Sequence, residues 1–217
     1  MPLLEIACFN PQSAAIAAAA GADRIELCEN QAAGGTTPPK AWLRQIKAAA
    51  ATAAAGGLEK REKKIPIFVM IRPRGGDFYY SDAEFEEMKA QIDAFQKEEK
   101  IDGFVFGLLD KTHPQQIDIS RTKELVQRAK PLPCTFHRAF DSTANPMQAL
   151  EDVVAAGCSA ILSSGGARDA GAGAAVLQQL VQASRGRITI IAGGGVRLSN
   201  IEGICATAGV HVCHSSA

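Results

Sequence analysis

The sequence lacks an excess of charge of either sign. Lysine and arginine together number 23 of the 217 residues, as do aspartate and glutamate, so the formal net charge at pH 7 is zero. A protein that binds nucleic acid needs a basic face for the phosphates, and this balance gives no sign of one. We therefore expect no nucleic-acid partner.

Long apolar runs are missing as well. No window approaches the roughly 20 apolar residues that cross a bilayer, although 47% of all residues are hydrophobic. The first ten residues, MPLLEIACFN, contain no basic region and only a short apolar stretch, unlike a secretion signal. The sequence predicts a cytoplasmic protein with a sizeable core and no membrane partner.

The cysteines form no pair of the C-x-x-C type. They are scattered, at Cys8, Cys28, Cys134, Cys158, Cys205 and Cys213. In a cytoplasmic chain this spacing favours free thiols over a disulfide framework, and it is not the spacing of a zinc site. The H-E-x-x-H, G-x-S-x-G and Walker patterns are absent too. No lysine lies within a predicted strand, so a Schiff-base mechanism lacks an obvious nucleophile.

The sequence does contain a regular alternation of apolar and helical segments. The apolar segments predict strands at residues 3–9, 24–28, 65–72, 103–109, 133–140, 160–165, 188–194 and 210–216. The segments between them predict helices at residues 11–20, 39–54, 82–98, 118–129, 146–156, 173–184 and 197–208. Strands that alternate with helices pair in parallel.

Eight such units predict a (β/α)₈ TIM-type barrel that forms a single α/β domain over residues 1–217. The alternative architecture is an open, doubly wound sheet. Because the sequence ends directly after the last predicted strand, we expect the eighth helix to be missing or atypical.

Ionisable residues gather toward one end of the predicted strands, where barrel enzymes have their active sites. Alternate strand residues share a face, which brings Glu5, Glu26 and His137 toward the barrel interior. His137 with Glu26 or Asp141 is a candidate general acid–base pair, and Glu5 is a further catalytic candidate. In the alternative interpretation, the two glutamates neutralise Arg72 and His137 as internal ion pairs.

The stretch IRPRGGDFYYSD, residues 71–82, follows the third predicted strand. Arg72 and Arg74 share a face there, and two guanidinium groups suit a carboxylate or a phosphate. We predict an anion clamp that includes Asp77. The alternative is that Arg74 and Asp77 pair with each other and order a loop or an interface.

The segments SSGGA, AGGGV and HSSA after the last three strands are rich in glycine and serine. Small residues let backbone N–H groups reach an anion, and phosphate sites in such barrels are commonly built by the loops after strands seven and eight. Glycine also simply permits tight turns. The predicted anion-binding residues here are Arg138, Ser163, Ser164, Gly194, Gly195, His214 and Ser215.

Several long strings together resemble the CutC copper homeostasis proteins from residue 3 onward. They are EIACF, GADRIELCENQAAGGTTP, VMIRPRGGDFYYSDAEFEEM, TFHRAFD, NPMQALEDVVAAG, ILSSGG and AGGGV. The resemblance implies a cytoplasmic (β/α)₈ barrel that self-associates as a dimer or tetramer. It also implies a role in copper tolerance, with Cu(I) bound by thiols.

Residue by residue, the resemblance implies that Cys28 is a copper ligand. The family's partner cysteine stands two residues after the first-strand glutamate, where this sequence has Ala7. Cys8 is adjacent, but it has the opposite strand parity and is expected to face the helices. The expected partner is therefore a copper ion. The alternative is a small anionic or phosphorylated metabolite, which an enzyme would turn over by general acid–base chemistry.

Overall fold

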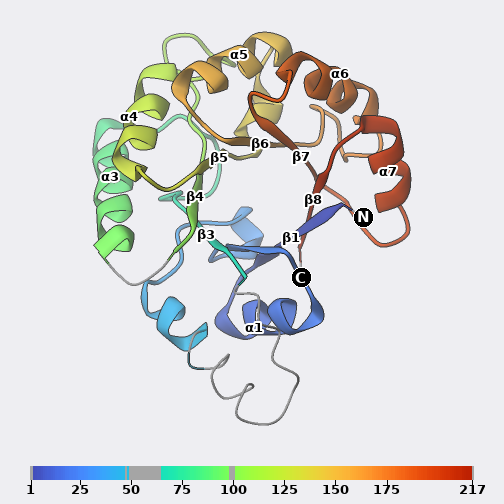
Figure 1. The fold of residues 1–217 in the computed structure, drawn as a ribbon. Helices are drawn as coiled ribbons and strands as arrows, with labels where there is room; N and C mark the ends of the chain where they lie inside the picture. Colours follow the sequence, from blue (N-terminus) through green and yellow to red (C-terminus); the bar gives the residue numbers. More distant parts are fainter. Residues whose placement is uncertain (1, 47, 49–64, 98–100, 217) are drawn as a thin grey trace.

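A computed structural model describes residues 2–46, 48, 65–97 and 101–216 of the chain. Its eight parallel strands pair in chain order, and β8 pairs with β1 to close a barrel. The predicted (β/α)₈ barrel is confirmed, and this closure excludes the open, doubly wound sheet. Figure 1 shows the helices as a ring outside the strands.

The strands are short and lie close to their predicted positions. They are β1 (Leu3–Cys8), β2 (Arg24–Leu27), β3 (Ile67–Met70), β4 (Gly103–Phe106), β5 (Cys134–Phe136), β6 (Ala160–Ser163), β7 (Thr189–Gly193) and β8 (Val212–Ser216). The helices are α1 (Pro11–Ala20), α3 (Asp82–Lys97), α4 (Ile119–Ala129), α5 (Pro146–Ala156), α6 (Ala174–Ser184) and α7 (Ile201–Ala208). Two 3₁₀ turns are η1 (Gln31–Ala33) and η2 (Arg138–Ser142). Residues 41–46 are also helical, and the rest of the helix predicted at 39–54 lies partly outside the described residues.

Local sequence signals set several helix ends. The side chain of Asn10 accepts a hydrogen bond from the Ser13 N–H at the start of α1. Asn145 caps α5 in the same way, and proline follows at the first helical position. Gly157 ends α5 with a φ of 91°, a left-handed conformation that glycine adopts without steric cost.

The prediction that the fifth strand reaches residue 140 is wrong. The β4–β5 ladder ends at the pair Phe106 and Phe136. His137 then caps η2, and its ring nitrogen accepts a hydrogen bond from the Ala139 N–H. Gly107 permits this arrangement, because a Cβ there would lie 2.4 Å from the His137 ring. The chain therefore turns at the carboxyl end of β5 and leaves the imidazole over the barrel.

Apolar side chains pack on both sides of the strands. The larger apolar cluster lies between barrel and helices and includes Phe104, Phe106 and Ile161. Inside the barrel, Phe68, Met70 and Val105 form part of one small apolar cluster, and Leu162 belongs to another. These small clusters fill only part of the interior, so the remaining interior positions hold the buried polar residues.

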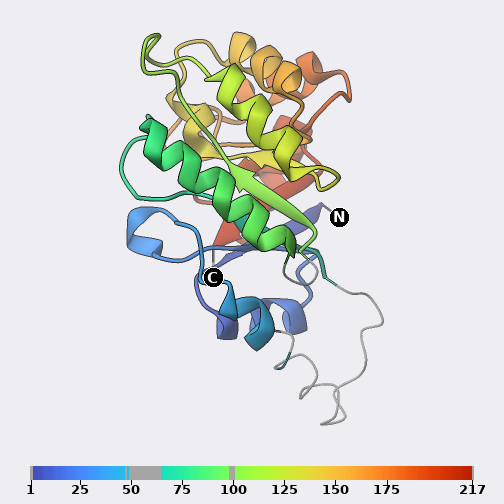
Figure 2. The same ribbon diagram turned by 90° about the vertical axis from the view of Figure 1, so that its left-hand side faces the viewer.

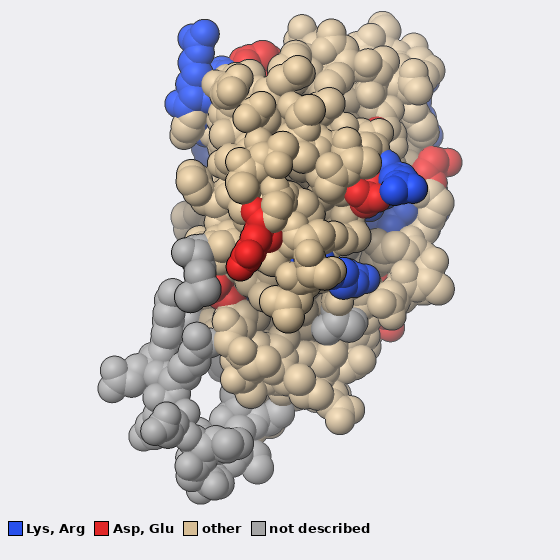
Figure 3. Space-filling model, turned by 90° about the vertical axis from the view of Figure 1, so that its right-hand side faces the viewer, with Lys and Arg blue, Asp and Glu red and all other residues tan. Residues whose placement is uncertain are grey.

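Ion pairs connect neighbouring helices on the outer surface. Figure 2 shows α3 and α4 lying side by side on one flank of the barrel. Arg128 binds both carboxylate oxygens of Asp93, and Lys89 contacts Glu124. On the face drawn in Figure 3, charged side chains of both signs lie in small separate groups. Among the described residues, no helix has both the length and the apolar character that a membrane crossing requires.

Candidate functional site

A pocket of about 130 Å³ lies at the carboxyl ends of the barrel strands. Its lining comes from residues at or just beyond the ends of several strands. Six predicted site residues line it: Glu26, Cys28, Arg72, His137, Arg138 and His214. The barrel therefore gathers side chains that are far apart in the sequence around one small cavity.

At this pocket, the carboxylates of Glu5 and Glu26 converge on the imidazole of His214. The Nδ1 atom of His214 lies 2.7 Å from Glu5 Oε1 and 3.7 Å from Glu26 Oε2. The Nε of Arg24 donates a hydrogen bond to the other oxygen of Glu5. Both glutamates are buried, and Glu26 Oε2 has no hydrogen-bond partner among the described residues.

The electrostatics of this cluster separate the two carboxyl groups. Burial alone would raise the pKa of Glu5, but the hydrogen bonds and charges of His214 and Arg24 hold it below its ordinary value. Burial and the charge of Glu5 raise the pKa of Glu26. Burial opposes the charged form of His214, but the two glutamates raise its pKa. Glu5 is therefore the stable carboxylate, and Glu26 takes up a proton more readily.

A thiol and a thioether lie beside the cluster. Cys28 Sγ donates to Glu26 Oε1 at 3.2 Å. Cys28 and Met70 belong to one buried apolar cluster and line the same pocket. A Cβ added to Gly35 would lie 3.4 Å from Cys28 Sγ and 3.8 Å from the Met70 terminal methyl group. Met70 was not among the predicted site residues, although its parity with Arg72 on the third predicted strand indicates the same face.

His137 presents an unpaired donor. The residue is 4% exposed, and its Nδ1 accepts a hydrogen bond from the Ala139 N–H. The proton of the neutral ring is therefore on Nε2, which has no partner in the described part of the chain. Burial, together with the charge of Arg72, lowers the pKa of His137 to about 3. His137 is thus a neutral imidazole at physiological pH.

Arg72 lines the pocket, but both terminal nitrogens of its guanidinium group already donate to backbone carbonyls. One terminal nitrogen donates to the carbonyls of Ala33 and Gly35 at 2.9 and 3.0 Å, and the other donates to Gly76 O at 2.8 Å. The guanidinium lies 4.8 Å from the centre of the Phe78 ring. Only the buried Nε lacks a partner among the residues described. Arg72 therefore orders two loops, and of its three nitrogens only Nε has no partner among the described residues.

Arg74 and Asp77 do not join Arg72 around the pocket. Arg74 Nη2 contacts Asp77 Oδ1 at 2.9 Å, and its Nε donates to Glu84. The structure therefore contradicts a two-arginine clamp and contains instead the alternative pair of Arg74 and Asp77. The physical reason is local: two acidic side chains lie within reach of Arg74 in its own loop and in the first turn of α3.

The carboxylate of Asp141 occupies the serine–glycine loop after β6. It accepts hydrogen bonds from Ser163 Oγ at 2.6 Å, Ser164 N at 3.1 Å and Gly166 N at 3.3 Å. Arg138 Nε donates to it at 2.8 Å. Donors predicted to hold a phosphate thus hold the chain's own carboxylate. No contact joins Asp141 to His137 among the hydrogen bonds of the described residues, which does not support their predicted acid–base pairing.

The remaining predicted residues lie outside the pocket lining. Gly194 packs against Arg138, since a Cβ there would lie 3.2 Å from the guanidinium. Gly195 has a φ of 67°. The hydroxyl of Ser215 donates a hydrogen bond to the carbonyl of Val196, the residue after Gly195. Cys8 is buried in the layer between barrel and helices, where burial raises its pKa to about 11. Its strand parity placed it there.

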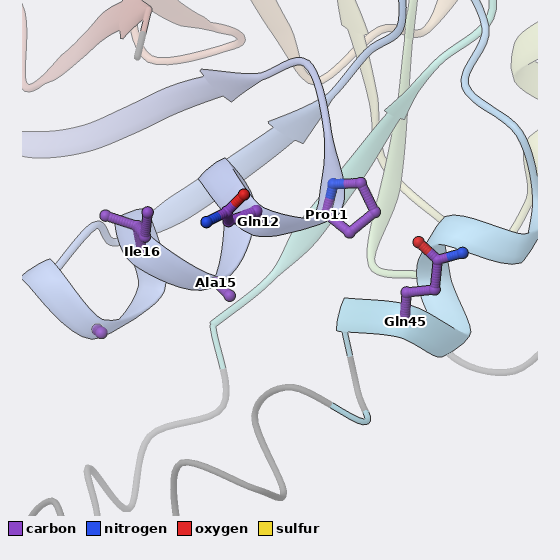
Figure 4. Close-up of a pocket in the computed structure, with 6 residues that line it drawn as sticks. Pro11, Gln12, Ala15, Ile16 and Gln45 are labelled. Carbon is purple, nitrogen blue, oxygen red and sulfur yellow. The ribbon is translucent and has the colours of Figure 1, made fainter.

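A second pocket lies at the outside of the barrel, between α1 and the helical residues 41–46. It has a volume of about 430 Å³, and its lining includes Pro11, Ile16 and Gln45 (Figure 4). The lining side chains contain no titratable group. We therefore place the candidate chemistry in the pocket at the strand ends.

Known proteins resemble this chain over nearly its whole length. A profile of the CutC family matches residues 2–217. The family protein CutC of Chromobacterium violaceum is 43% identical over 215 residues, which are 99% of this chain and 81% of that protein. The copper homeostasis protein cutC homolog of Homo sapiens is 40% identical over 215 residues, 99% of this chain and 73% of that protein.

Solved structures also resemble this chain, and one of them is a CutC protein. The crystal structure of a CutC from Streptococcus agalactiae has a TM-score of 0.84 and 32% identity, and the match covers 99% of this chain and 98% of that one. A deoxyribose phosphate aldolase from Aeropyrum pernix has a TM-score of 0.66 at 12% identity, covering 98% of this chain and 85% of that one. The second likeness shows the fold alone.

Proposed function

The chain belongs to the CutC family, and on that premise we propose that it acts in copper homeostasis by binding Cu(I) in the pocket at the strand ends. The human relative carries a name that refers to copper homeostasis. In this proposal copper is the cargo, and the pocket supplies its ligands.

The pair of sulfur atoms in the pocket carries the proposal. Cu(I) prefers thiolate and thioether ligands. Cys28 supplies the first and Met70 the second, and both lie in one buried cluster. The pocket lining includes Ala7, which stands where the family has its second cysteine and offers no donor. We therefore assign the second soft ligand to Met70.

A thiol must lose its proton when it binds copper. Burial and the nearby carboxylates raise the pKa of Cys28 well above its ordinary value. The hydrogen bond from Cys28 Sγ to Glu26 Oε1 gives this proton a direct acceptor, and burial already raises the pKa of Glu26. Glu26 would receive the proton as the thiolate forms on the metal.

Titration of the reduced protein with Cu(I) against a competing chelator tests the proposal. We expect about one tightly bound equivalent, lost in Cys28→Ser and weakened in Met70→Leu. Cys158→Ser removes a buried thiol away from the pocket and is expected to bind as wild type does. Ala7→Cys restores the family's pattern and should tighten binding. Absence of stoichiometric binding, or binding indifferent to Cys28, would contradict the proposal.

A second candidate function is an enzyme that acts on a small anionic metabolite. The observation in its favour is that His137 Nε2 and Arg72 Nε are buried donors without partners in the described structure, and both residues line the pocket. A bound carboxylate or carbonyl oxygen would satisfy them. Glu26 would then be the general base, because its raised pKa suits proton transfer.

A thermal-stability screen with inorganic phosphate and a panel of small carboxylates tests this second function. A true ligand should raise the melting temperature of wild type but not of His137→Asn, whose side chain cannot reproduce the ring donor. His113→Asn is the matched control, because His113 is 66% exposed and lies outside the pocket lining. Equal responses from wild type and His137→Asn to every probe would remove this candidate.

A further inference from the structure

The closure of the barrel brings three potential metal ligands together. One atom each from Glu5, Glu26 and His214 lies within 4.8 Å of the others. The strand register is responsible: Glu5 on β1 is the direct partner of His214 on β8, while Glu26 on β2 is the partner of Ala7. The three side chains therefore project from adjacent strands into the same part of the barrel interior.

An unsatisfied atom in this group points to a ligand. Glu26 is 3% exposed, and its Oε2 has no hydrogen-bond partner within the described residues. That oxygen lies 3.7 Å from His214 Nδ1, beyond hydrogen-bond distance. A buried carboxylate oxygen without a partner is costly. Ion pairing alone would leave this cost in place, whereas a cation between Glu26 and His214 would remove it.

The donor set indicates the class of cation. One imidazole nitrogen and two carboxylate oxygens suit a borderline divalent ion such as Zn²⁺. Tetrahedral zinc with ligand bonds of about 2.1 Å places neighbouring donors roughly 3.4 Å apart. The distances from His214 Nδ1 to Glu5 Oε1 and Glu26 Oε2, 2.7 and 3.7 Å, bracket that spacing.

We propose that Glu5, Glu26 and His214 form a binding site for one borderline divalent cation, represented by Zn²⁺. Arg24 donates to Oε2 of Glu5, which leaves Oε1 to the ion. The guanidinium of Arg24 is itself held 4.3 Å from the centre of the Phe68 ring. The site therefore uses a different set of atoms from the sulfur pair proposed for Cu(I).

The site is accessible from the pocket. Glu26 and His214 both line the cavity at the strand ends, whereas Glu5 is fully buried beneath them. Three protein ligands leave a fourth position open, as in zinc sites that carry out chemistry. Because Glu26 and His214 line that cavity, a small molecule in the pocket could bind the ion at the open position.

Zinc titration of metal-free protein by calorimetry tests the site. We expect one equivalent of Zn²⁺ to bind to wild type. Glu26→Gln and His214→Asn should weaken binding by about 100-fold or more, because loss of even an outer-shell partner costs 10–100-fold. His113→Asn, which changes an exposed histidine, should bind as wild type does. Mg²⁺ should not compete, because it demands oxygen ligands in octahedral geometry.

Cys28→Ser separates this proposal from the copper proposal. It should abolish Cu(I) binding and leave Zn²⁺ binding intact, whereas His214→Asn should have the opposite effect. Co²⁺ bound in place of Zn²⁺ should give visible absorption without a thiolate charge-transfer band. Circular dichroism and thermal melting establish whether each variant is folded. If His214→Asn does not fold, Glu26→Gln, which keeps the side-chain shape, tests the site instead. Absent Zn²⁺ binding, binding unchanged in folded Glu26→Gln, or a thiolate band would overturn the proposal.

Discussion

Glu5 and His214 are 209 positions apart in the sequence, yet Glu5 Oε1 lies 2.7 Å from His214 Nδ1. They are register partners where β8 closes the barrel onto β1. The first and last strands are thus joined by backbone hydrogen bonds and by one polar contact in which Glu5 is fully buried. Removal of the His214 side chain leaves the buried Glu5 carboxylate without that contact.

We expect His214→Ala to lower the free energy of unfolding by about 3 kcal/mol, the low end for breaking a buried pair. The low end applies because Arg24 still contacts Glu5. Urea unfolding in the presence of a metal chelator measures the change without any contribution from bound ions. The exposed control His113→Ala should change stability by less than about 0.5 kcal/mol. Equal effects of the two substitutions would contradict the structural role of His214.

Stability should fall in acid because of His137. Its folded-state pKa is lowered to about 3, whereas an unfolded histidine titrates near 6.5. The unfolded chain therefore takes up a proton below about pH 6.5 that the folded chain refuses. The resulting loss approaches about 1.4 kcal/mol per pH unit between about pH 6 and pH 4. Above about pH 6.5 this residue has no effect on the slope.

The measurement compares wild type with His137→Asn by urea unfolding at several pH values. The variant lacks a titrating side chain at this position, so the difference in stability between the two proteins should shift in favour of the variant as the pH falls. Parallel stability curves from pH 7 to pH 4 would show that His137 takes up protons equally in both states.

Asp141 is expected to act as a built-in anion for the loop after β6. Asp141→Ala leaves the Ser163 hydroxyl, the Ser164 backbone N–H and Arg138 Nε without their acceptor, which should cost about 2–3 kcal/mol. Formate or phosphate should restore part of the loss by binding in the vacated position. Wild type, whose carboxylate fills that position, should respond less to these anions. The readout is the melting temperature as a function of anion concentration, with chloride as the control salt.

Two glycine substitutions form a matched pair. A Cβ at Gly107 would lie 2.4 Å from the His137 ring, so Gly107→Ala should displace the imidazole and destabilise the fold by about 1–3 kcal/mol. Gly203 lies within α7 with no neighbouring atom near its added Cβ. Gly203→Ala should therefore raise stability by up to about 1 kcal/mol, through helix propensity alone. Urea unfolding measures the change in the free energy of unfolding for both variants. An unchanged value for Gly107→Ala would show that the His137 ring moves without cost.

Strand parity predicted on which side of the sheet several of the candidate site residues lie. It directed Glu5 and Glu26 to the interior and Cys8 to the helix layer, because side-chain direction along a strand is a local property. His137 lines the pocket from a position just beyond the end of β5. Met70 was not predicted as a site residue. Its parity with Arg72 fits its place in the pocket lining, but parity does not distinguish a thioether ligand from an ordinary apolar core side chain.

The barrel can be predicted from the amino-acid sequence. Its alternation of apolar and helical segments, with caps such as Asn145 and Gly157, is a periodic and local signal, and parallel pairing follows from it. For other polar groups, the partners follow only from the tertiary structure. Arg72 binds the carbonyl of Ala33, 39 residues away, and Asp141 accepts from Gly166, 25 residues away. Such contacts depend on how separate loops fold over the barrel end, and no local pattern encodes that.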